Sequence, residues 1–520
     1  MKRFGTRPLL GALTGILFLA HALFYWRALG GDAIDDAYIS FVYARNAILG
    51  YGLVFNPGER VEGFTNFLWT GMMIPVVGAG LDVGRVSIVL GALLALATLW
   101  LTVRLARAAR LPSWTGRLAA LCLAADGSFA IWAVSGLETA MFAFLVTLGA
   151  LLYLVEQTRS RWISNSGIVF ALAAMTRPEA AAVFALTAGH QLAWRVLKER
   201  RLFAWTDITR GLTFSALFVP YWLLRWRYYH SFFPNSFYAK VAPGGPIAQI
   251  ERGWHYVTQF VDVHLGILIL LPAVIALLMA FARSLRRNPD EREAERPLFA
   301  QSYFALAVLA YAAYITYVGG DWSVGRFFVP VLPLAYLLLA AGLVEIYRFL
   351  KGTAERLLSS GRLRGPAPLA AGAAALMLFL GALAFDSSWN GEYGIFVRGF
   401  DAARATEARE TMGRWLRAHV PAGTLIAVDA AGQVPFYSGL PAIDMFGIND
   451  LHIGRLSVPT LGEGTPGHEK FDLAYVIQRD PQYVVIYGTL LDNVTQYRRA
   501  PVQWTTDRQL MEFLTLYERK

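Results

Sequence analysis

Eleven apolar runs recur along the first 385 residues of this 520-residue sequence, and they constrain the fold more than any other feature. A helix needs about 20 mostly apolar residues to cross the hydrocarbon core of a bilayer. The sequence therefore predicts an α-helical polytopic membrane protein with about eleven transmembrane helices. The runs lie near 8–25, 86–103, 117–134, 137–155, 164–176, 180–194, 211–226, 264–282, 299–318, 327–347 and 367–385.

The composition agrees with a membrane protein and excludes several other classes. Hydrophobic residues make up 56% of the chain and charged residues 16%, whereas a soluble domain carries about 25% charge. A disordered chain, a coiled coil and a disulfide scaffold are excluded. The single cysteine, Cys122, allows no disulfide within the chain and no cysteine-based metal site.

The basic residues predict the orientation of the chain. Arg and Lys gather in the segments 104–117, 195–210, 283–296 and 348–364, which follow the second, sixth, eighth and tenth runs. Such residues collect in cytoplasmic loops, so the N-terminus is expected inside and the region after the eleventh run outside. The net charge of +10 therefore reflects topology and not a nucleic-acid partner. We expect a bacterial plasma-membrane protein whose first run is a retained helix and not a cleaved signal peptide.

Two apolar stretches depart from this scheme. Residues 64–80 are apolar enough for a short span, but counting them as one would place the first basic loop outside. We expect a helix that lies in or dips into the outer leaflet. The runs 164–176 and 180–194 are separated by Arg177-Pro178-Glu179, and charges at such a depth are tolerated where they line a polar cavity.

The composition changes after Asp386. Residues 400–419 read as an amphipathic helix, and residues 424–429 and 483–488 read as buried strands. The sequence predicts a transmembrane domain at 1–385, with its first external loop at 26–85, and a small extracytoplasmic α/β domain at 386–520.

Two adjacent acids, Asp35 and Asp36, stand at the outer end of the first predicted helix. Like charges this close raise the pKa of one of them, which suits a general base that must accept a proton near neutral pH. The alternative is structural, because either acid is a suitable N-cap for an amphipathic helix over 36–48. Both interpretations remain open at this point.

Other polar residues at the outer side also have two interpretations. Glu138 is either a helix cap or a substrate contact, and Arg177 and Glu179 either pair with each other or line a cavity. Asp321 beside Trp322 is either a turn or a sugar site, since sugars bind through carboxylate hydrogen bonds and aromatic stacking. Arg225 and Arg227 are expected to anchor the chain at the interface beside Trp and Tyr residues. Aromatic residues such as Tyr43, Trp69 and Tyr238 are more often packing residues than sugar platforms.

Several segments together resemble a known family. The first external loop contains Asp35-Asp36-Ala37-Tyr38-Ile39-Ser40, followed by Gly52–Trp69 with Asn56-Pro57-Gly58-Glu59 and Gly63-Phe64-Thr65-Asn66. This loop resembles that of the bacterial GT-C membrane glycosyltransferases that include the terminal β-1,2-arabinofuranosyltransferases of cell-wall arabinan. Later segments resemble the same family across nearly the whole chain, namely Ser135–Thr139, Thr176–Glu179, Pro234–Lys240, Gly319–Trp322, Arg326–Phe328, Asp444–Asp450 and Pro466–Lys470.

The resemblance implies a GT-C fold, a polyprenyl-phosphate-linked sugar as donor and a cell-envelope glycan as acceptor. It implies that Asp35 is the base and that Asp36 assists it. Cations near the headgroups are expected to bind the leaving phosphate, and for this role we select Lys240, Arg326 and Arg177. The expected substrate-binding residues are Tyr38, Arg45, Glu62, Asn66, Glu138, Glu179, Tyr238, Asp321, Trp322 and His468.

The finer expectations carry alternatives. Arabinofuranose on decaprenyl phosphate is the favoured donor, with a hexose such as mannose on undecaprenyl phosphate, or a glycoprotein or lipid A-type acceptor, as the alternatives. The stereochemical outcome is open. Two alternatives belong to other classes: a transporter or flippase of lipid-linked sugar, and a non-catalytic assembly scaffold. Transporters are often built from related halves, and the sequence shows no internal repeat, which argues against a transporter. The histidines show no metal-binding spacing, so no divalent cation is expected to be required. We expect a monomer.

Overall fold

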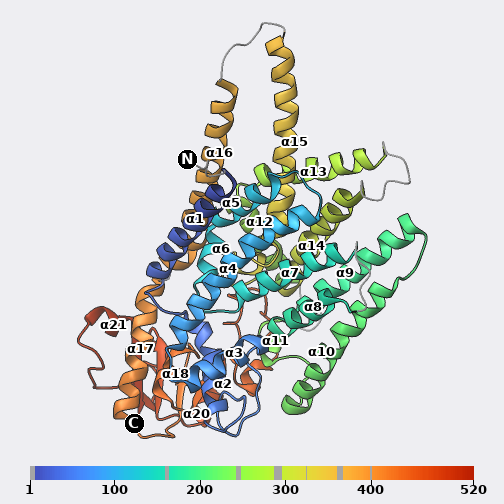
Figure 1. The fold of residues 1–520 in the computed structure, drawn as a ribbon. Coiled ribbons are helices and arrows are strands. Elements are labelled where there is room, and N and C mark those ends of the chain that lie inside the picture. Colours follow the sequence, from blue (N-terminus) through green and yellow to red (C-terminus); the bar gives the residue numbers. More distant parts are fainter. Residues whose placement is uncertain are drawn as a thin grey trace.

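The computed structural model describes residues 6–157, 163–241, 247–285, 295–323, 325–359, 367–398 and 401–520. Figure 1 shows a tall bundle of helices with a small sheet-containing domain at one end, where the C-terminus lies. Helices α15 and α16 extend furthest from that domain, and the described N-terminal end lies beside them.

Every predicted apolar run is helical in the structure. The helices of the bundle are α1 (Thr6–Ala28), α4 (Val83–Ala108), α5 (Thr115–Ala125), α6 (Gly127–Ala133), α7 (Thr139–Glu156), α8 (Asn165–Thr176), α9 (Ala180–Trp194), η1 (Arg195–Glu199), α10 (Trp205–Tyr229), α12 (Ile247–Val263), α13 (Ile267–Leu285), α14 (Arg296–Val318), η3 (Arg326–Phe328), α15 (Leu332–Ser359), α16 (Ala367–Phe385) and η4 (Asp386–Arg398). The run 117–134 is divided at Asp126, whose carboxylate caps α6 by accepting a hydrogen bond from the backbone N–H of Phe129 at 2.8 Å.

Six of the described helices are long and apolar enough to cross a membrane, and the count of eleven spans stays a prediction. The six are Leu9–Ala28, Val83–Ala108, Thr139–Glu156, Ile267–Ser284, Arg296–Val318 and Leu332–Thr353. The ambiguous stretch 64–80 forms helix α3 (Phe67–Gly78), which has 12 residues. Such a helix is about 18 Å long, too short for a hydrocarbon core of about 30 Å.

Ion pairs connect the basic segments that the sequence places on one side of the membrane. Lys198 contacts Glu295 at 2.9 Å, which joins the segments after the sixth and eighth runs. Arg283 pairs with Glu345, which joins the eighth run to the tenth. These segments therefore lie at the same end of the bundle, as the charge pattern requires. Residues 286–294 and 360–366 of these segments lie outside the described residues.

The C-terminal region is an α/β unit. Its sheet has the strand order β2-β1-β3-β5-β4, with parallel pairing of β1 to β2 and β3 and antiparallel pairing of β5 to β3 and β4. The elements are α17 (Ala402–His419), β1 (Ile426–Val428), α18 (Gln433–Ser438), β2 (Ala442–Asp444), α19 (Leu451–Gly454), α20 (Leu473–Gln478), β3 (Tyr483–Tyr487), β4 (Tyr497–Arg499), α21 (Arg508–Phe513) and β5 (Leu514–Arg519). The predicted amphipathic helix and the two predicted strands correspond to α17, β1 and β3.

The first external segment is part of the same core as this α/β unit. Helix α2 (Asp35–Ile48) contributes Val42 and Tyr43 to a buried cluster that also contains Met412 of α17 and Val428 of β1. The short helix α11 (Asn235–Lys240) contacts the unit at α19. Burial of an aliphatic or aromatic side chain is worth about 1.5–3 kcal/mol, so this shared core fixes the first loop against the C-terminal unit.

Candidate functional site

The acid pair lies in the first turn of α2, where the membrane helices meet the C-terminal unit. Residue Ile34 occupies the N-cap position, and its backbone N–H donates to the carbonyl of Ser135 at 3.0 Å. Neither acid caps the helix, so the capping alternative for the pair is wrong. Successive residues of an α-helix point about 100° apart, and the two carboxylates consequently face different partners.

The Asp35 carboxylate faces the C-terminal unit. Its two oxygens accept hydrogen bonds from the backbone N–H groups of Gln433, at 2.8 Å, and Gly432, at 3.1 Å. The guanidinium of Arg409 lies 4.0 Å away, and the Asp35 side chain is 11% exposed. Burial raises the pKa of Asp35, while Arg409 and the two N–H donors oppose that shift. A buried carboxyl that is held by fixed donors is a well-oriented proton acceptor.

The Asp36 carboxylate faces the membrane domain and lies in a charged network. Its side chain is 36% exposed, and Arg326 contacts it at 3.5 Å. The same guanidinium lies 3.4 Å from Asp321 and 3.8 Å from Glu138. Arg177 contacts Glu138 at 2.8 Å and Glu179 at 2.5 Å. We call these six residues, Asp36, Glu138, Arg177, Glu179, Asp321 and Arg326, the Arg326 network.

Neutral groups hold the Arg326 network in place. The Asn66 amide donates to Glu138 at 2.7 Å, and Asn66 in turn accepts from the hydroxyls of Ser40 of α2 and Thr70 of α3, each at 3.0 Å. Glu138 occupies the N-cap position of α7, but its carboxylate forms no capping hydrogen bond. The carboxylate instead contacts the arginines and Asn66. Asp36 and Arg326, which are 290 residues apart in sequence, meet at this point.

Aromatic rings cover the two guanidiniums of the network. Arg177 lies over Phe327 at 5.3 Å, and Arg326 lies over Trp132 at 5.3 Å. The Trp132 ring meets Trp322 edge to face at 6.3 Å. Cation–π contacts strengthen when the cation is desolvated, so these rings fix the guanidinium planes. The Nε atom of Arg326 has no hydrogen-bond partner among the residues that the structure describes.

Three residues selected as substrate contacts have partners within the fold. The Tyr38 hydroxyl donates to Asp32 at 2.6 Å and lies 2.7 Å from the Tyr437 hydroxyl. Arg45 donates to the carbonyls of Pro435 and Phe436 at 3.0 and 2.8 Å, so it attaches α2 to the segment around α18.

The third is Glu62, which forms a buried ion pair with Arg225 at 2.6 Å. Arg225 is therefore not the interfacial anchor that the sequence suggested. Tyr43 and Trp69 were expected to be packing residues, and the structure agrees. Both side chains are buried, and each donates a hydrogen bond to a backbone carbonyl.

A second group of predicted residues lies between α11 and the C-terminal unit. Lys240 packs against Gly467, where an added Cβ would stand 3.0 Å from its Cε. His468 packs edge to face on Phe446, and Tyr238 stacks under Arg455. The structure therefore separates Lys240 from the other two predicted phosphate-binding cations, which both belong to the Arg326 network.

Arg252 of α12 links this second group to the network. Its Nε donates to the carbonyl of Gly319 at 2.9 Å, two residues before Asp321, and its other end contacts Glu469 at 2.8 Å. Gly319 allows this close packing, because its φ is +86° and an added Cβ would stand 2.8 Å from Nη2 of Arg252. Sequence reasoning missed Arg252, since nothing local distinguishes it from other helical arginines.

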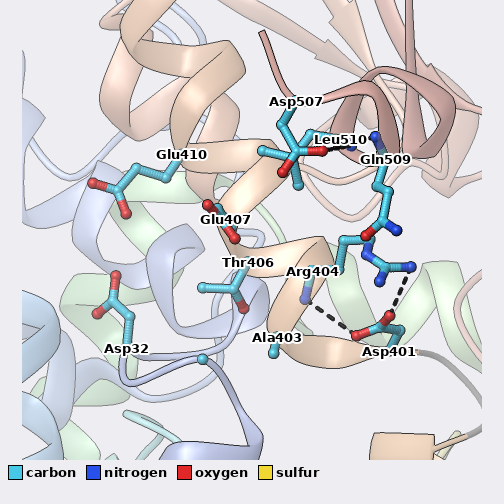
Figure 2. Close-up of a pocket in the computed structure, with 11 residues that line it drawn as sticks. Asp32, Asp401, Ala403, Arg404, Thr406, Glu407, Glu410, Asp507, Gln509 and Leu510 are labelled. Atoms are coloured by element: carbon cyan, nitrogen blue, oxygen red, sulfur yellow. Dashed lines mark hydrogen bonds and ion pairs between the residues drawn. The ribbon is translucent and has the colours of Figure 1, made fainter. Parts of the chain in front are cut away.

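Sequence reasoning also missed Asp32. Burial raises its pKa, and it borders a cavity of about 400 Å³ between the first external segment, α17 and α21. Figure 2 shows Asp32 and Glu410 on facing sides of this cavity, with Glu407 and Thr406 from α17 beside them. Its lining includes no residue of the Arg326 network. Among the described residues, no group of three or more His, Cys, Asp or Glu is placed to hold a metal ion.

Two curated proteins are similar to the chain over 60% of its length. Both are terminal β-(1→2)-arabinofuranosyltransferases, from Corynebacterium glutamicum at 27% identity over 346 residues and from Mycobacterium tuberculosis at 29% over 347 residues. The chain spans about half the length of these relatives, 48% and 52% respectively. Residues 398–518 match a family model described as a domain of unknown function, DUF8728. The resemblance found in the sequence is confirmed.

Solved structures establish the fold. ArnT from Cupriavidus metallidurans, crystallised with undecaprenyl phosphate, superposes over 96% of this chain and 97% of its own, with a TM-score of 0.59 at 14% identity. The chain has the GT-C fold. An oligosaccharyltransferase from Archaeoglobus fulgidus, solved with zinc and sulfate, has a TM-score of 0.54 at 12% identity and covers 91% of this chain and 68% of its own. The GT-C fold and the apolar helices together make the chain a multi-pass membrane protein.

Proposed function

We propose that this GT-C protein is a glycosyltransferase that moves a sugar from a polyprenyl-phosphate donor to a glycan of the cell envelope. The observation that carries the proposal is the acid pair in the first turn of α2, with one carboxylate held by backbone N–H groups and the other in contact with Arg326. The similarity to arabinofuranosyltransferases favours arabinofuranose as the sugar.

The proposed reaction needs a base and a cation, and the site offers both. The acceptor hydroxyl attacks the anomeric carbon of the donor, and its proton passes to Asp35. The bond between that carbon and the phosphate oxygen breaks, and the polyprenyl phosphate leaves with the bonding electrons. The charge that grows on this phosphate is stabilised by preorganised cations. Arg326 is the first candidate, because its Nε donates to no described residue.

The network is not a simple phosphate site. Four carboxylates and two guanidiniums form it, so its ionised form carries a net negative charge. We propose that donor binding draws Arg326 partly away from its carboxylates toward the phosphate. Lys240, on the edge of the second group, then serves the more distant part of the donor or acceptor. We place the site on the extracytoplasmic face of the plasma membrane and the N-terminus inside, in accord with the basic segments at the opposite end of the bundle.

The test is sugar transfer by the purified full-length protein. The probes are synthetic decaprenyl-phospho-arabinofuranose and undecaprenyl-phospho-mannose, each with an arabinan oligosaccharide as acceptor. We expect an extended oligosaccharide with the arabinose donor, and the same rate with and without EDTA. Extension from the mannose donor alone would change the sugar and keep the reaction class. If no sugar is transferred but intact donor moves between the leaflets of a proteoliposome, the protein is a flippase and the proposal fails.

The pH profile of this transfer reports on Asp35. The proposed base must be ionised, and burial raises its pKa, so activity should fall on acidification at a pH above the ordinary carboxyl range of about 4. Arg409 opposes the shift, so Arg409→Gln is expected to move this acid limb to higher pH. Arg417→Gln is the matched control, because Arg417 is exposed on the same helix. Identical limbs in both variants would contradict the assignment.

A further inference from the structure

The side-chain amide of Gln433 is a buried polar group that the proposed reaction does not use. Gln433 follows Gly432 in the segment that holds the proposed base, and its backbone N–H donates to Oδ1 of Asp35 at 2.8 Å. The residue is fully buried, at 0% exposure, although glutamine is mostly an exposed residue in proteins. The fold therefore places an enclosed amide directly beside the proposed base.

This amide lacks a partner. Neither Nε2 nor Oε1 of Gln433 forms a hydrogen bond with any residue that the structure describes. Its chain neighbours are apolar, since Ala431 and Val434 belong to the buried cluster that also contains Met412 and Val428. A buried amide that leaves both a donor and an acceptor unpaired is costly, and native proteins nearly always pair such atoms. The missing partners indicate that a bound group completes Gln433.

Close packing fixes the backbone of Gln433 and leaves its amide unbonded. An added Cβ at Gly413 of α17 would stand 3.4 Å from the carbonyl oxygen of Gln433, and one at Gly432 would overlap the carbonyl oxygen of Asp35. The segment thus lies between α17 and α2. The Cα of Gln433 is within about 4.3 Å of Oδ1 of Asp35, because N and Cα are about 1.46 Å apart. The amide, two methylenes further on, loses no hydrogen bond when it rotates toward a ligand of Asp35.

An acceptor sugar has the chemistry that satisfies both side chains. A carboxylate has about four lone-pair positions, so the two N–H bonds leave room on Asp35 for the attacking hydroxyl. A primary amide donates from Nε2 and accepts at Oε1. The donor matches the lone pair of the attacking hydroxyl, and the acceptor matches the proton of a second hydroxyl. A sugar ring with two adjacent hydroxyls offers this pair.

We infer that Gln433 binds the acceptor sugar, with Nε2 donating to the attacking hydroxyl and Oε1 accepting from the hydroxyl next to it. The inference rests on the proposed function and deepens it, because it requires an acceptor with two adjacent hydroxyls. The segment then has two tasks, since its backbone N–H groups orient the base and its side chain selects the acceptor. A buried water is the other source of a hydroxyl at this place, and the experiment distinguishes the two.

The experiment compares Gln433→Met with Gln478→Met in the full-length protein. The donor is decaprenyl-phospho-arabinofuranose, or undecaprenyl-phospho-mannose if the wild type accepts only that one, and the acceptor is an arabinan oligosaccharide. Met resembles Gln in shape but has no amide, and residue 433 keeps the N–H that holds Asp35. Gln478, exposed at the end of α20, is the matched control in the same unit.

We expect Gln433→Met to raise the acceptor KM by roughly 10- to 100-fold, as the loss of two hydrogen bonds predicts. The donor KM and the acid limb of the pH profile should stay unchanged, because the donor phosphate and Asp35 keep their partners. Gln478→Met should match the wild type in all three. If the wild type transfers sugar and both variants have its acceptor KM, the inference fails and the proposed function stands. If the wild type transfers no sugar, both fail.

A second arm uses the wild type and needs no folded variant. Its acceptor is an arabinan oligosaccharide whose terminal ring lacks the hydroxyl next to the attacking one. We expect its KM to be roughly 10-fold higher than that of the parent acceptor in the wild type, and no such difference in Gln433→Met, which has no Oε1 to lose. Equal KM values for the two acceptors in the wild type would contradict the inference.

Thermal unfolding distinguishes the acceptor from a buried water. An amide without a partner contributes no hydrogen bond to the free protein, so Gln433→Met should leave the unfolding temperature unchanged or raise it. A water held by the amide would instead be lost in the variant. A lower unfolding temperature together with an unchanged acceptor KM would therefore assign Gln433 to a structural water and overturn the inference.

Discussion

Asp35→Asn is expected to lower the rate of sugar transfer by about 10²- to 10⁴-fold, the range over which a positioned general base contributes. The substitution is nearly isosteric, and the remaining amide oxygen still accepts one of the two N–H bonds from Gly432 and Gln433. The loss should appear in kcat, because the carboxylate acts on the acceptor proton and not on the lipid. Initial rates with the lipid-linked donor measure it.

The fold should tolerate this substitution. Burial raises the pKa of Asp35, which means that the folded protein favours its neutral form. Stability from this group is therefore present at low pH and lost as the pH rises through the raised pKa. A neutral Asn is expected to leave the unfolding temperature unchanged or slightly higher at pH 7. Asp82→Asn is the matched control, because Asp82 caps α4 at an exposed position and Asn caps equally well. If Asp35→Asn transfers sugar at the wild-type rate, Asp35 is not the general base, and Asp36 is the next candidate.

The helices and the strands could be predicted because their signals are local. Apolar runs, the Arg177-Pro178-Glu179 break and the alternation after Asp386 each depend on neighbouring residues, and each corresponds to an element of the structure. The GT-C resemblance supplied the six residues of the Arg326 network from five separate segments. Their convergence confirms that these segments form one site in space, although their roles toward a substrate stay predictions.

The partners of the charged residues could not be predicted from the sequence. Glu62 and Arg225 are 163 residues apart, and only the fold shows that they neutralise each other. The sequence treats Asp35 and Asp36 as one acid pair, whereas helix geometry turns them toward different domains. Lys240 has the charge and the depth of a phosphate ligand, but the α11 segment places it against Gly467. Charge and depth are properties of a residue, while pairing depends on the whole fold.

Gly432→Ala is expected to lower transfer by about 100-fold through the position of Asp35, without touching any reacting group. An added Cβ would stand 1.8 Å from the backbone oxygen of Asp35 and 2.9 Å from its Cγ. Backbone atoms of α2 cannot rotate away as a flexible side chain does, so the segment that carries Gly432 and Gln433 must move. Both N–H donors then leave the carboxylate, and a displacement of about 1 Å costs on the order of 10²-fold in rate.

Gly71→Ala is the control for this effect, because Gly71 lies in α3 of the same external segment and an added Cβ there meets nothing within 4 Å. The two variants are compared by kcat, by the KM for the donor and by thermal unfolding. We expect Gly432→Ala to lose kcat with an unchanged donor KM, since the donor phosphate is proposed to bind at Arg326. If both variants transfer sugar at the wild-type rate, contact with the C-terminal unit does not orient the base. If Gly432→Ala instead raises the donor KM at constant kcat, the Gly432 segment serves donor binding and Asp35 is not positioned by it.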